Sequence, residues 1–358
     1  MQNAPSSLRA LWRQGLSRFT PVYFILVMST GIVSIAAEQQ GFEAIARALF
    51  AFNLIAYAVI WLLTLIRLVF WGPGLLHDLL DANRGFGFLT LVAGTCVLGV
   101  QLIVLANLTA IAAALWALAL VLWLGLLYTF FTVLILREQK PGLAQDIHGG
   151  WLIAVVSTQA LCVLGTMLAP QIGPWRLEAQ FATLCLYLLG AMIYGLIIPM
   201  IFERLIFFTL TPTALRPLNW IDMGASAITV LAGDTLVRAQ YSGPLHVEMV
   251  PILKASTVFF WVGASWWIPL LLILGFWRHL VRRFPFTYDL QYWGMVFPIG
   301  MYAACTEQLA IVLRFEALHW LSRLVCYVAI AAWLVVCLGM LRRLGRALWG
   351  IAPPEQSG

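Results

Sequence analysis

Residues 110–136 read AIAAALWALALVLWLGLLYTFFTVLIL, a run without a single charged side chain. As an α-helix, a run of this length crosses the hydrocarbon core of a bilayer, which is about 30 Å thick. In lipid every backbone amide must be paired within the protein, so the run predicts a helix. The alternation over about ten residues that is typical of an outer-membrane barrel strand is absent from the sequence. The run therefore decides the fold class, an all-α integral membrane protein.

The composition extends this conclusion to the whole chain. The 358 residues are 62% hydrophobic and 10% charged, and the mean hydropathy is +0.92. Soluble domains carry roughly 25% charged residues, so this chain has too little polar surface for a water-soluble globule. Together with the run at 110–136, nine similar apolar runs predict ten membrane-spanning helices. The predicted spans are roughly residues 19–38, 46–70, 87–106, 110–136, 151–169, 178–202, 219–237, 251–276, 291–313 and 318–341.

The connections between spans are too short for a second domain. We expect an N-terminal segment at residues 1–18, a ten-helix transmembrane domain at 19–341 and a C-terminal tail at 342–358. If the N-terminus is cytoplasmic, 15 of the 21 Lys and Arg residues fall in inside segments and 6 in outside segments. This asymmetry follows the positive-inside rule. We therefore expect a multi-pass protein of the cell membrane, a bacterial inner membrane, with both termini cytoplasmic.

Several function classes are excluded by the pattern of charged and reactive residues. The net charge of +6 lies in short loops and not on one continuous face, so we expect no nucleic-acid partner. The six cysteines lie in apolar runs without a CxxC pair, and the five histidines lack a carboxylate at metal-ligand spacing. No nucleophile elbow or phosphate loop occurs. We expect no metal, no cofactor and no enzymatic activity.

Small and polar residues recur at helical spacing along the odd-numbered predicted spans. Spacings of three and four residues place each set on one helix face, and a polar face is costly in lipid. Five such faces predict five hairpins around a central pore. The alternative is close packing between helices, which small residues favour. The candidate pore-lining residues are Thr30, Ser34, Thr90, Gly94, Thr158, Cys162, Ser226, Thr229, Met301 and Cys305.

Four of the odd-numbered spans also carry a family resemblance. They read FTPVYFILVMSTGIVSIA (19–36), WLIAVVSTQ (151–159), NWIDMGASAITVLAG (219–233) and YWGMVFPIGMYAACT (292–306). These segments resemble the tellurite-resistance/dicarboxylate transporter family, which includes plant slow anion channels and fungal malate permeases. The Trp followed by Phe-Pro in the last segment is the most specific match, and the resemblance covers nearly the whole chain.

The resemblance implies ten helices in five hairpins, with the odd-numbered helices lining a pore in each subunit of a homotrimer. It implies small anions as substrates: malate and related dicarboxylates, chloride, nitrate and sulfite. It also implies a phenylalanine on the ninth helix that occludes the pore, and the Phe-Pro match assigns this role to Phe297. Gly294 stands where many relatives carry a bulkier residue.

The chemistry of the ninth span agrees with a gate. Pro298 lacks an amide proton, so the carbonyl of Gly294 loses its helical partner and we expect a kink there. A kink can push the ring of Phe297 away from the helix axis, where it would form an apolar constriction that blocks ions. The alternative is that Phe297 packs in the core of the bundle.

Two carboxylates are candidates for a proton or charge site, Glu307 and Asp222, because ionisable groups at membrane depth are often functional. Glu307 could instead pair with Lys254 or Arg314. No basic residue lies in the middle of a span, so anion selectivity would come from hydroxyl and amide donors, helix ends and basic vestibules. The sequence favours a channel-like pathway, and it leaves open a proton-coupled dicarboxylate carrier. An intramembrane enzyme and a membrane sensor are further alternatives.

Overall fold

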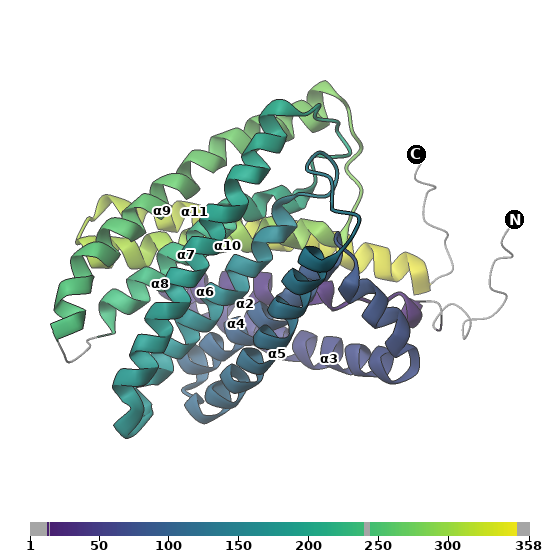
Figure 1. Cartoon of the computed structure of the whole chain (residues 1–358). Coiled ribbons are helices and arrows are strands. Elements are labelled where there is room, and N and C mark those ends of the chain that lie inside the picture. The colour runs from purple at the N-terminus through teal and green to yellow at the C-terminus, as the bar shows by residue number, and fades with distance from the viewer. Residues whose placement is uncertain (1–12, 14, 240–243, 349–358) are drawn as a thin grey trace, which may run out of the picture.

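The computed structural model describes residue 13 and residues 15–239 and 244–348 (Figure 1). Within these ranges the chain forms ten long α-helices and no strand, as predicted. Parts of the expected terminal segments, residues 1–12, 14 and 349–358, lie outside the described residues. The helices are α2 (Phe24–Gln39), α3 (Glu43–Leu80), α4 (Leu89–Ala106), α5 (Thr109–Leu136), α6 (Ile153–Leu168), α7 (Arg176–Phe207), α8 (Ile221–Arg238), α9 (Pro244–Phe276), α10 (Trp293–Leu313) and α11 (Ala317–Leu348).

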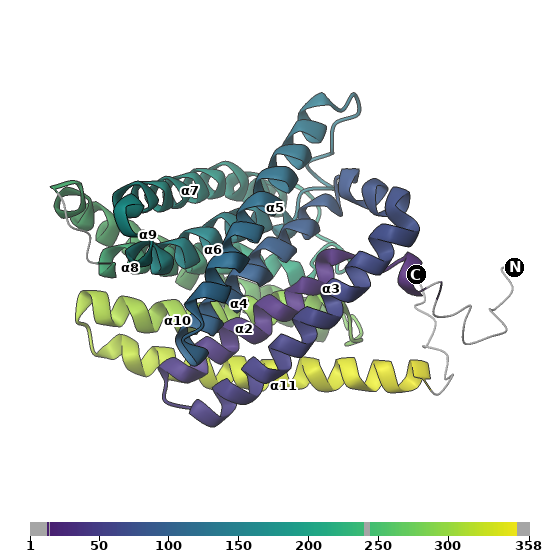
Figure 2. The ribbon, with the colours of Figure 1, turned by 90° about the horizontal axis from the view of Figure 1, so that it is seen from below.

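The helices pair as five consecutive hairpins, α2–α3, α4–α5, α6–α7, α8–α9 and α10–α11. The first helix of each hairpin packs against the first helices of two other hairpins. These contacts run from α2 to α4, α6, α8 and α10 and back to α2, so they close a ring of five. We call α2, α4, α6, α8 and α10 the inner helices. The other five, the outer helices, lie around this ring, and Figure 2 shows α11 running past α10 and α2.

Burial separates the two sets of helices. In α2, α4, α6 and α10 the most apolar windows are 72% to 94% buried, whereas in the outer helices the corresponding share is 22% to 39%. The outer helices turn large apolar side chains such as Val69, Val121 and Val335 outward, where lipid can solvate them. The alternation of odd and even spans read from the sequence therefore corresponds to an inner and an outer layer.

Nine of the described helices are long and apolar enough to cross a membrane. The tenth, α8, is not among them, since its 18 residues include Asp222, Asp234 and Arg238. Only three residues of α8 are not buried, because α6, α7, α9 and α10 surround it. The protein can therefore carry charge in this helix without exposing it to lipid.

Each inner helix begins with a single 3₁₀ turn. These turns are Pro21–Tyr23, Gly85–Phe88, Gly149–Leu152, Pro217–Trp220 and Leu290–Tyr292. Within each hairpin the outer helix returns antiparallel, so all five inner helices start at the same end of the bundle. We call this the basic end, because Arg84, Arg137, Arg204, Arg216 and Arg278 lie in or beside the connections there.

At the basic end α3 bends sharply. Trp71 has a non-helical backbone (φ −137°, ψ 35°), and Pro73 follows it, as expected for a residue that cannot continue the amide ladder. The predicted span 46–70 therefore ends at the bend, and residues 72–80 form a further helical segment. Asp78 in this segment accepts from Arg67 at 2.6 Å and from Arg84 at 2.7 Å. These ion pairs tie the bend to the start of α4.

Candidate functional site

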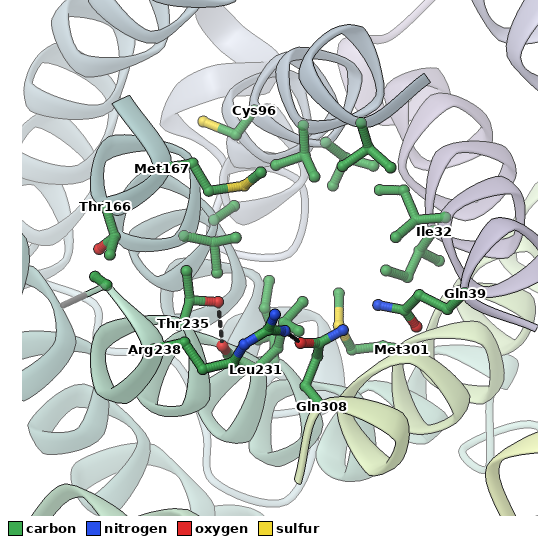
Figure 3. A pocket seen from close by; sticks show the side chains of 18 of the residues that line it. Ile32, Gln39, Cys96, Thr166, Met167, Leu231, Thr235, Arg238, Met301 and Gln308 are labelled. Atoms are coloured by element: carbon green, nitrogen blue, oxygen red, sulfur yellow. Dashed lines mark hydrogen bonds between the residues drawn. The ribbon is translucent and has the colours of Figure 1, made fainter. Parts of the chain in front are cut away.

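A cavity of about 430 Å³ lies on the axis of the bundle, inside the ring of inner helices (Figure 3). Every inner helix contributes residues from its C-terminal half, which confirms that the five helices run in the same direction. The wall includes Ile32, Ile35, Gln39, Cys96, Val97, Val100, Val104, Ala160, Val163, Thr166, Met167, Pro170, Ile228, Leu231, Thr235, Arg238, Ala239, Met301 and Gln308.

Polar groups gather where the cavity meets the ends of the inner helices. We call Gln39, Thr235, Arg238 and Gln308 the mouth of the cavity. The guanidinium of Arg238 donates to the amide oxygen of Gln308, as the dashed line in Figure 3 shows. Helix C-termini carry a partial negative charge, and the fixed positive charge of Arg238 counters it at this position. The mouth can therefore attract an anion.

The deeper wall of the cavity is apolar and comprises Ile32, Val97, Ala160, Ile228 and Met301. Apart from the thiol of Cys96, no described side chain in this deeper part donates a hydrogen bond. An anion in this part would lose hydration without gaining a fixed cation, so its binding would be weak.

Phe297 lies four residues before Met301, on the same face of α10 and one turn nearer the basic end. Its side chain is fully buried. The residues one turn below the wall on three other inner helices, Met28, Ala93 and Val156, have no solvent exposure either. By helical spacing these four residues form a buried layer between the cavity and the basic end, and Phe297 has the largest side chain among them.

The helix that carries Phe297 packs closely on its neighbours. α10 continues as one helix through Pro298. A Cβ atom on Gly294 would lie 2.9 Å from Cδ2 of Leu218 and 3.1 Å from Cδ1 of Ile25. A bulkier residue at 294 would need these side chains to move, so the absence of a side chain at Gly294 allows the start of α10 to approach α2 and the turn before α8.

Among the ten candidate pore-lining residues, the structure places Met301 in the cavity wall. The hydroxyls of three others bond to outer helices. Thr30 accepts from the indole of Trp333 at 3.0 Å, and Thr158 accepts from the indole of Trp123 at 2.9 Å. Ser34 donates to the carbonyl of Ala46 at 2.8 Å.

The remaining six candidates are also buried and also contact other parts of the protein. Two of them bond to outer helices: Cys162 to the carbonyl of Thr183 at 3.2 Å and Ser226 to that of Phe260 at 2.7 Å. Thr90, Thr229 and Cys305 bond to carbonyls near them, and Gly94 faces Phe24. The contacts are Thr90 to Pro21 at 3.0 Å, Thr229 to Ala225 at 2.8 Å, and Cys305 to Tyr302 at 3.4 Å.

The polar faces of the inner helices therefore point mainly toward other protein, and the cavity wall between them is apolar. These nine residues are not part of the wall of this cavity, and their lining of the rest of the pathway stays a prediction. A hydroxyl in a low-dielectric bundle is stabilised by a fixed carbonyl or indole partner. These hydrogen bonds agree with close packing of helices, the alternative reading of the stripes.

The two candidate carboxylates lie away from the cavity wall. Glu307 contacts His319 Nδ1 at 2.7 Å and accepts from the amide of Gln40 at 2.9 Å. The pairing with Lys254 or Arg314 considered from the sequence was wrong, because the first turns of α11 bring His319 back against α10. Asp222 lies at the basic end, fully buried, and neither carboxylate oxygen has a hydrogen-bond partner among the described residues.

A buried histidine is held neutral at the basic end. His148 directly precedes the turn into α6, and its Nδ1 accepts from the backbone amide of Gly150 at 3.0 Å. Burial, reinforced by the charges of Arg216 and Arg204, lowers the pKa of His148 to about 4. The net positive charge at this end therefore comes from arginines and Lys140, and His148 does not add to it. Within the described ranges, no group of three or more His, Cys, Asp or Glu residues is placed to hold a metal ion.

Arg238 and Gln39 were missed as site residues from the sequence, because they lie at the ends of spans, where polar residues are common. One signal was present. Arg238 ends the one predicted odd-numbered span whose helix also carries Asp222 and Asp234. Three charges in 18 residues indicate a helix that faces protein and water, and such a helix can place its terminal arginine over the pathway.

Comparisons with known proteins agree with this architecture. Residues 18–341 match the family described as voltage-dependent anion channel, SLAC1. An uncharacterized transporter of Methanocaldococcus jannaschii is 20% identical over 92% of this chain and 96% of its own length. A sulfite efflux pump, SSU1, of Arthroderma otae is 21% identical over 90% of this chain and 89% of its own. An uncharacterized membrane protein of Mycobacterium tuberculosis is 32% identical over 42% of this chain and 75% of its own.

The family match covers nearly the whole chain and all ten helices. It agrees with a multi-pass membrane protein that has an internal pathway suited to anions. The chain belongs to the voltage-dependent anion channel (SLAC1) family.

Proposed function

We propose that the protein conducts small anions passively through the ring of inner helices, with Phe297 as the gate. One observation carries this proposal: the cavity lined by all five inner helices ends one turn above Phe297. An apolar ring in a pathway too narrow for a hydrated ion excludes water and blocks conduction. The buried state of Phe297 then corresponds to the closed pathway.

The direction of the inner helices supports an anion over a cation. Their five N-termini, which carry partial positive charge, converge at the basic end. Arginines in the adjoining connections add full charges there, and Arg238 supplies one at the mouth of the cavity. Together these charges favour an anion at both ends of the pathway, and weak binding in between lets it leave.

The single positive charge in the cavity wall favours small inorganic anions and oxyanions over C4-dicarboxylates. Arg238 is the sole cation among the described residues of the wall, so the second carboxylate of malate would lie against apolar side chains. Sulfite, the anion in the name of the fungal relative, is a small oxyanion. Dicarboxylate transport, the other substrate class that the sequence suggested, requires a second cation or a wider pathway.

The proposal includes the orientation and the assembly. The basic end faces the cytoplasm, as the distribution of Lys and Arg predicts, and three subunits associate as the family resemblance implies. Gln139 and Gln171 are exposed and lie before and after α6, at opposite ends of the bundle. Cysteines at these positions should react with an impermeant thiol reagent from opposite sides of the membrane. Labelling of both from one side would contradict the orientation.

Flux into liposomes tests the function. Chloride, nitrate, sulfite and malate are compared at equal concentration, with and without a pH gradient, against liposomes that lack the protein. We expect the small anions to move down their own concentration gradients at a rate that does not depend on the pH gradient. Malate should move more slowly. Malate uptake that collapses with the pH gradient would instead establish the proton-coupled carrier.

A further inference from the structure

A second cavity, of about 340 Å³, lies at the basic end, outside the ring. It is formed by the end of α9, the π-helical turn Trp277–Val281 that follows, and the turns that lead into α8 and α10. We call it the peripheral pocket. Its wall combines three basic side chains, Arg216, Arg278 and His279, with apolar ones from α9 such as Leu272 and Phe276.

The apolar part of the peripheral pocket continues onto the outer surface. Leu272, Phe276 and Leu280 are 57%, 59% and 62% exposed, so they line the pocket and also face the surroundings of the bundle. α9 is one of the helices long and apolar enough to cross a membrane. A hydrocarbon chain lying along the end of α9 would cover these side chains without any rearrangement of the protein.

The basic part of the pocket is only partly neutralised by the protein, since Asp289 interacts electrostatically with Arg278 but forms no salt bridge with it. No salt bridge among the described residues involves Arg216, Arg278 or His279. The Nε atom of Arg278 is buried without a hydrogen-bond partner in the described part of the chain. The carboxylate of Asp289, in the loop after the pocket, accepts from the backbone amide of Gln291 at 2.9 Å. Two guanidinium groups that form no salt bridge among the described residues suit a phosphate, which they bind by charge and by directed donors.

Aromatic contacts hold the basic groups in place. The guanidinium carbon of Arg278 lies 4.3 Å from the centre of the Phe284 ring. The ring of His279 stacks on Phe286 with centroids 3.7 Å apart and 15° between the planes. These contacts fix the side chains at the edge of the apolar surface, so less conformational entropy is lost when a ligand binds.

We propose that the peripheral pocket binds an anionic phospholipid, with the phosphate between Arg216 and Arg278 and the acyl chains along the end of α9. The combination of a cationic rim, an apolar surface facing the membrane and a place at the end of a spanning helix matches this ligand in both charge and shape. A soluble phosphate lacks the acyl chains, and a zwitterionic lipid carries a positive charge beside its phosphate that weakens its attraction to the two arginines.

The pocket also contacts the helices that hold the gate. Tyr292 and Met295 line it at the start of α10, and Met295 lies two residues before Phe297. Asn219 and Trp220 line it in the turn before α8. A bound lipid would hold these two starts together and stabilise the closed position of Phe297. This effect on flux rests on the proposed anion conduction, whereas the binding itself does not.

The test uses the full-length protein, purified and delipidated, with native mass spectrometry to count bound lipids. Phosphatidylglycerol should bind more tightly than phosphatidylcholine, and glycerophosphate, the headgroup without acyl chains, should not bind. Arg216→Gln and Arg278→Gln should each weaken phosphatidylglycerol binding about tenfold, the loss expected for one charged hydrogen bond. Arg137→Gln removes a charge at the same end outside the pocket and should bind as the wild type does.

Equal binding of phosphatidylglycerol by wild type and by both pocket variants would overturn the site. Binding of glycerophosphate as tight as that of the lipid would overturn the lipid assignment. If Arg278→Gln does not fold, Arg216→Gln, whose side chain is exposed, carries the test alone. Flux in phosphatidylglycerol and phosphatidylcholine liposomes is measured separately. Lipid binding without any change in flux would refute the coupling to the gate and leave the binding site standing.

Discussion

Gly224 of α8 lies directly against Pro298 of α10, and a Cβ atom on Gly224 would come within 2.7 Å of Cγ of Pro298. No side chain fits between the two helices at this point. The contact lies beside Phe297, so it fixes the distance between α8 and the helix that carries the proposed gate. The peripheral pocket contacts the same two helices one turn nearer the basic end.

Gly224→Ala should therefore force α8 and α10 apart. We expect a loss of stability of roughly 1–3 kcal/mol, as is usual for an extra methyl group in a filled core, together with a change in anion flux. Gly125→Ala on the outer helix α5 is the matched control, because no atom lies within 4 Å of its Cβ position. Thermal unfolding and liposome flux measure both effects. Equal behaviour of the two variants would show that the α8–α10 contact does not position the gate.

Arg238→Gln should lower anion flux by up to about tenfold at low ionic strength, because it removes the positive charge at the mouth and keeps a polar side chain. The difference in flux from wild type should shrink in about 1 M salt, where the Debye screening length is about 3 Å. Arg238→Lys should retain most of the flux. Arg314→Gln removes an exposed charge outside the cavity wall. If it reduces flux as much as Arg238→Gln, the mouth has no special role.

Glu307→Gln should leave anion flux at the wild-type level, with and without a pH gradient. The carboxylate bonds to His319 and Gln40 and does not reach the cavity wall, so a proton on it cannot couple directly to the anion in the pathway. The loss of the charged hydrogen bond should lower stability by about 2 kcal/mol. The opposite pattern, flux lost together with its dependence on the pH gradient, would make Glu307 the proton site of a carrier.

Lowering the pH should destabilise the folded protein through the titration of His148. The pKa of the buried imidazole is about 4, below the 6.5 of an exposed histidine. Between these values the unfolded chain binds a proton that the folded protein does not, so acid favours unfolding. The loss should begin below pH 6.5 and reach about 3 kcal/mol near pH 4. His148→Asn should flatten this part of the unfolding curve, measured in detergent from pH 7 to 4. If the pH dependence of stability were unchanged in this variant, another titratable group would be responsible for it.

The layered architecture could be predicted from the sequence because lipid imposes strict rules. The uncharged run at 110–136 and the small residues of the odd-numbered spans each have one physical interpretation, an outer and an inner helix. The ends of spans agree within a few residues, except where the outer helices continue beyond the expected membrane edge, as α9 and α11 do.

The direction of individual side chains could not be predicted in this way. A hydroxyl such as that of Thr158 is satisfied equally by water in a pathway and by the indole of Trp123, 35 residues away in the sequence. The partner lies on another helix, so a single-helix pattern does not distinguish the two. The wall residues Val163 and Leu231 are apolar and resemble lipid-facing ones, so polar stripes in the sequence do not indicate the cavity.

The central claim, that Phe297 is the gate, is tested most directly by measuring anion flux with the Phe297→Ala variant. The proposed gate lies in a buried layer below the cavity, so its truncation should open a path that water enters, and flux should rise well above wild type. Phe297→Leu should give a smaller rise. Phe130→Ala is the matched control, since Phe130 is equally buried but packs on Phe86 and Trp151, outside the cavity wall. It should lose roughly 3–5 kcal/mol of stability and gain no flux. Flux is normalised to folded protein in each sample. A Phe297→Ala protein that is destabilised like Phe130→Ala and conducts no better than wild type would contradict the gate.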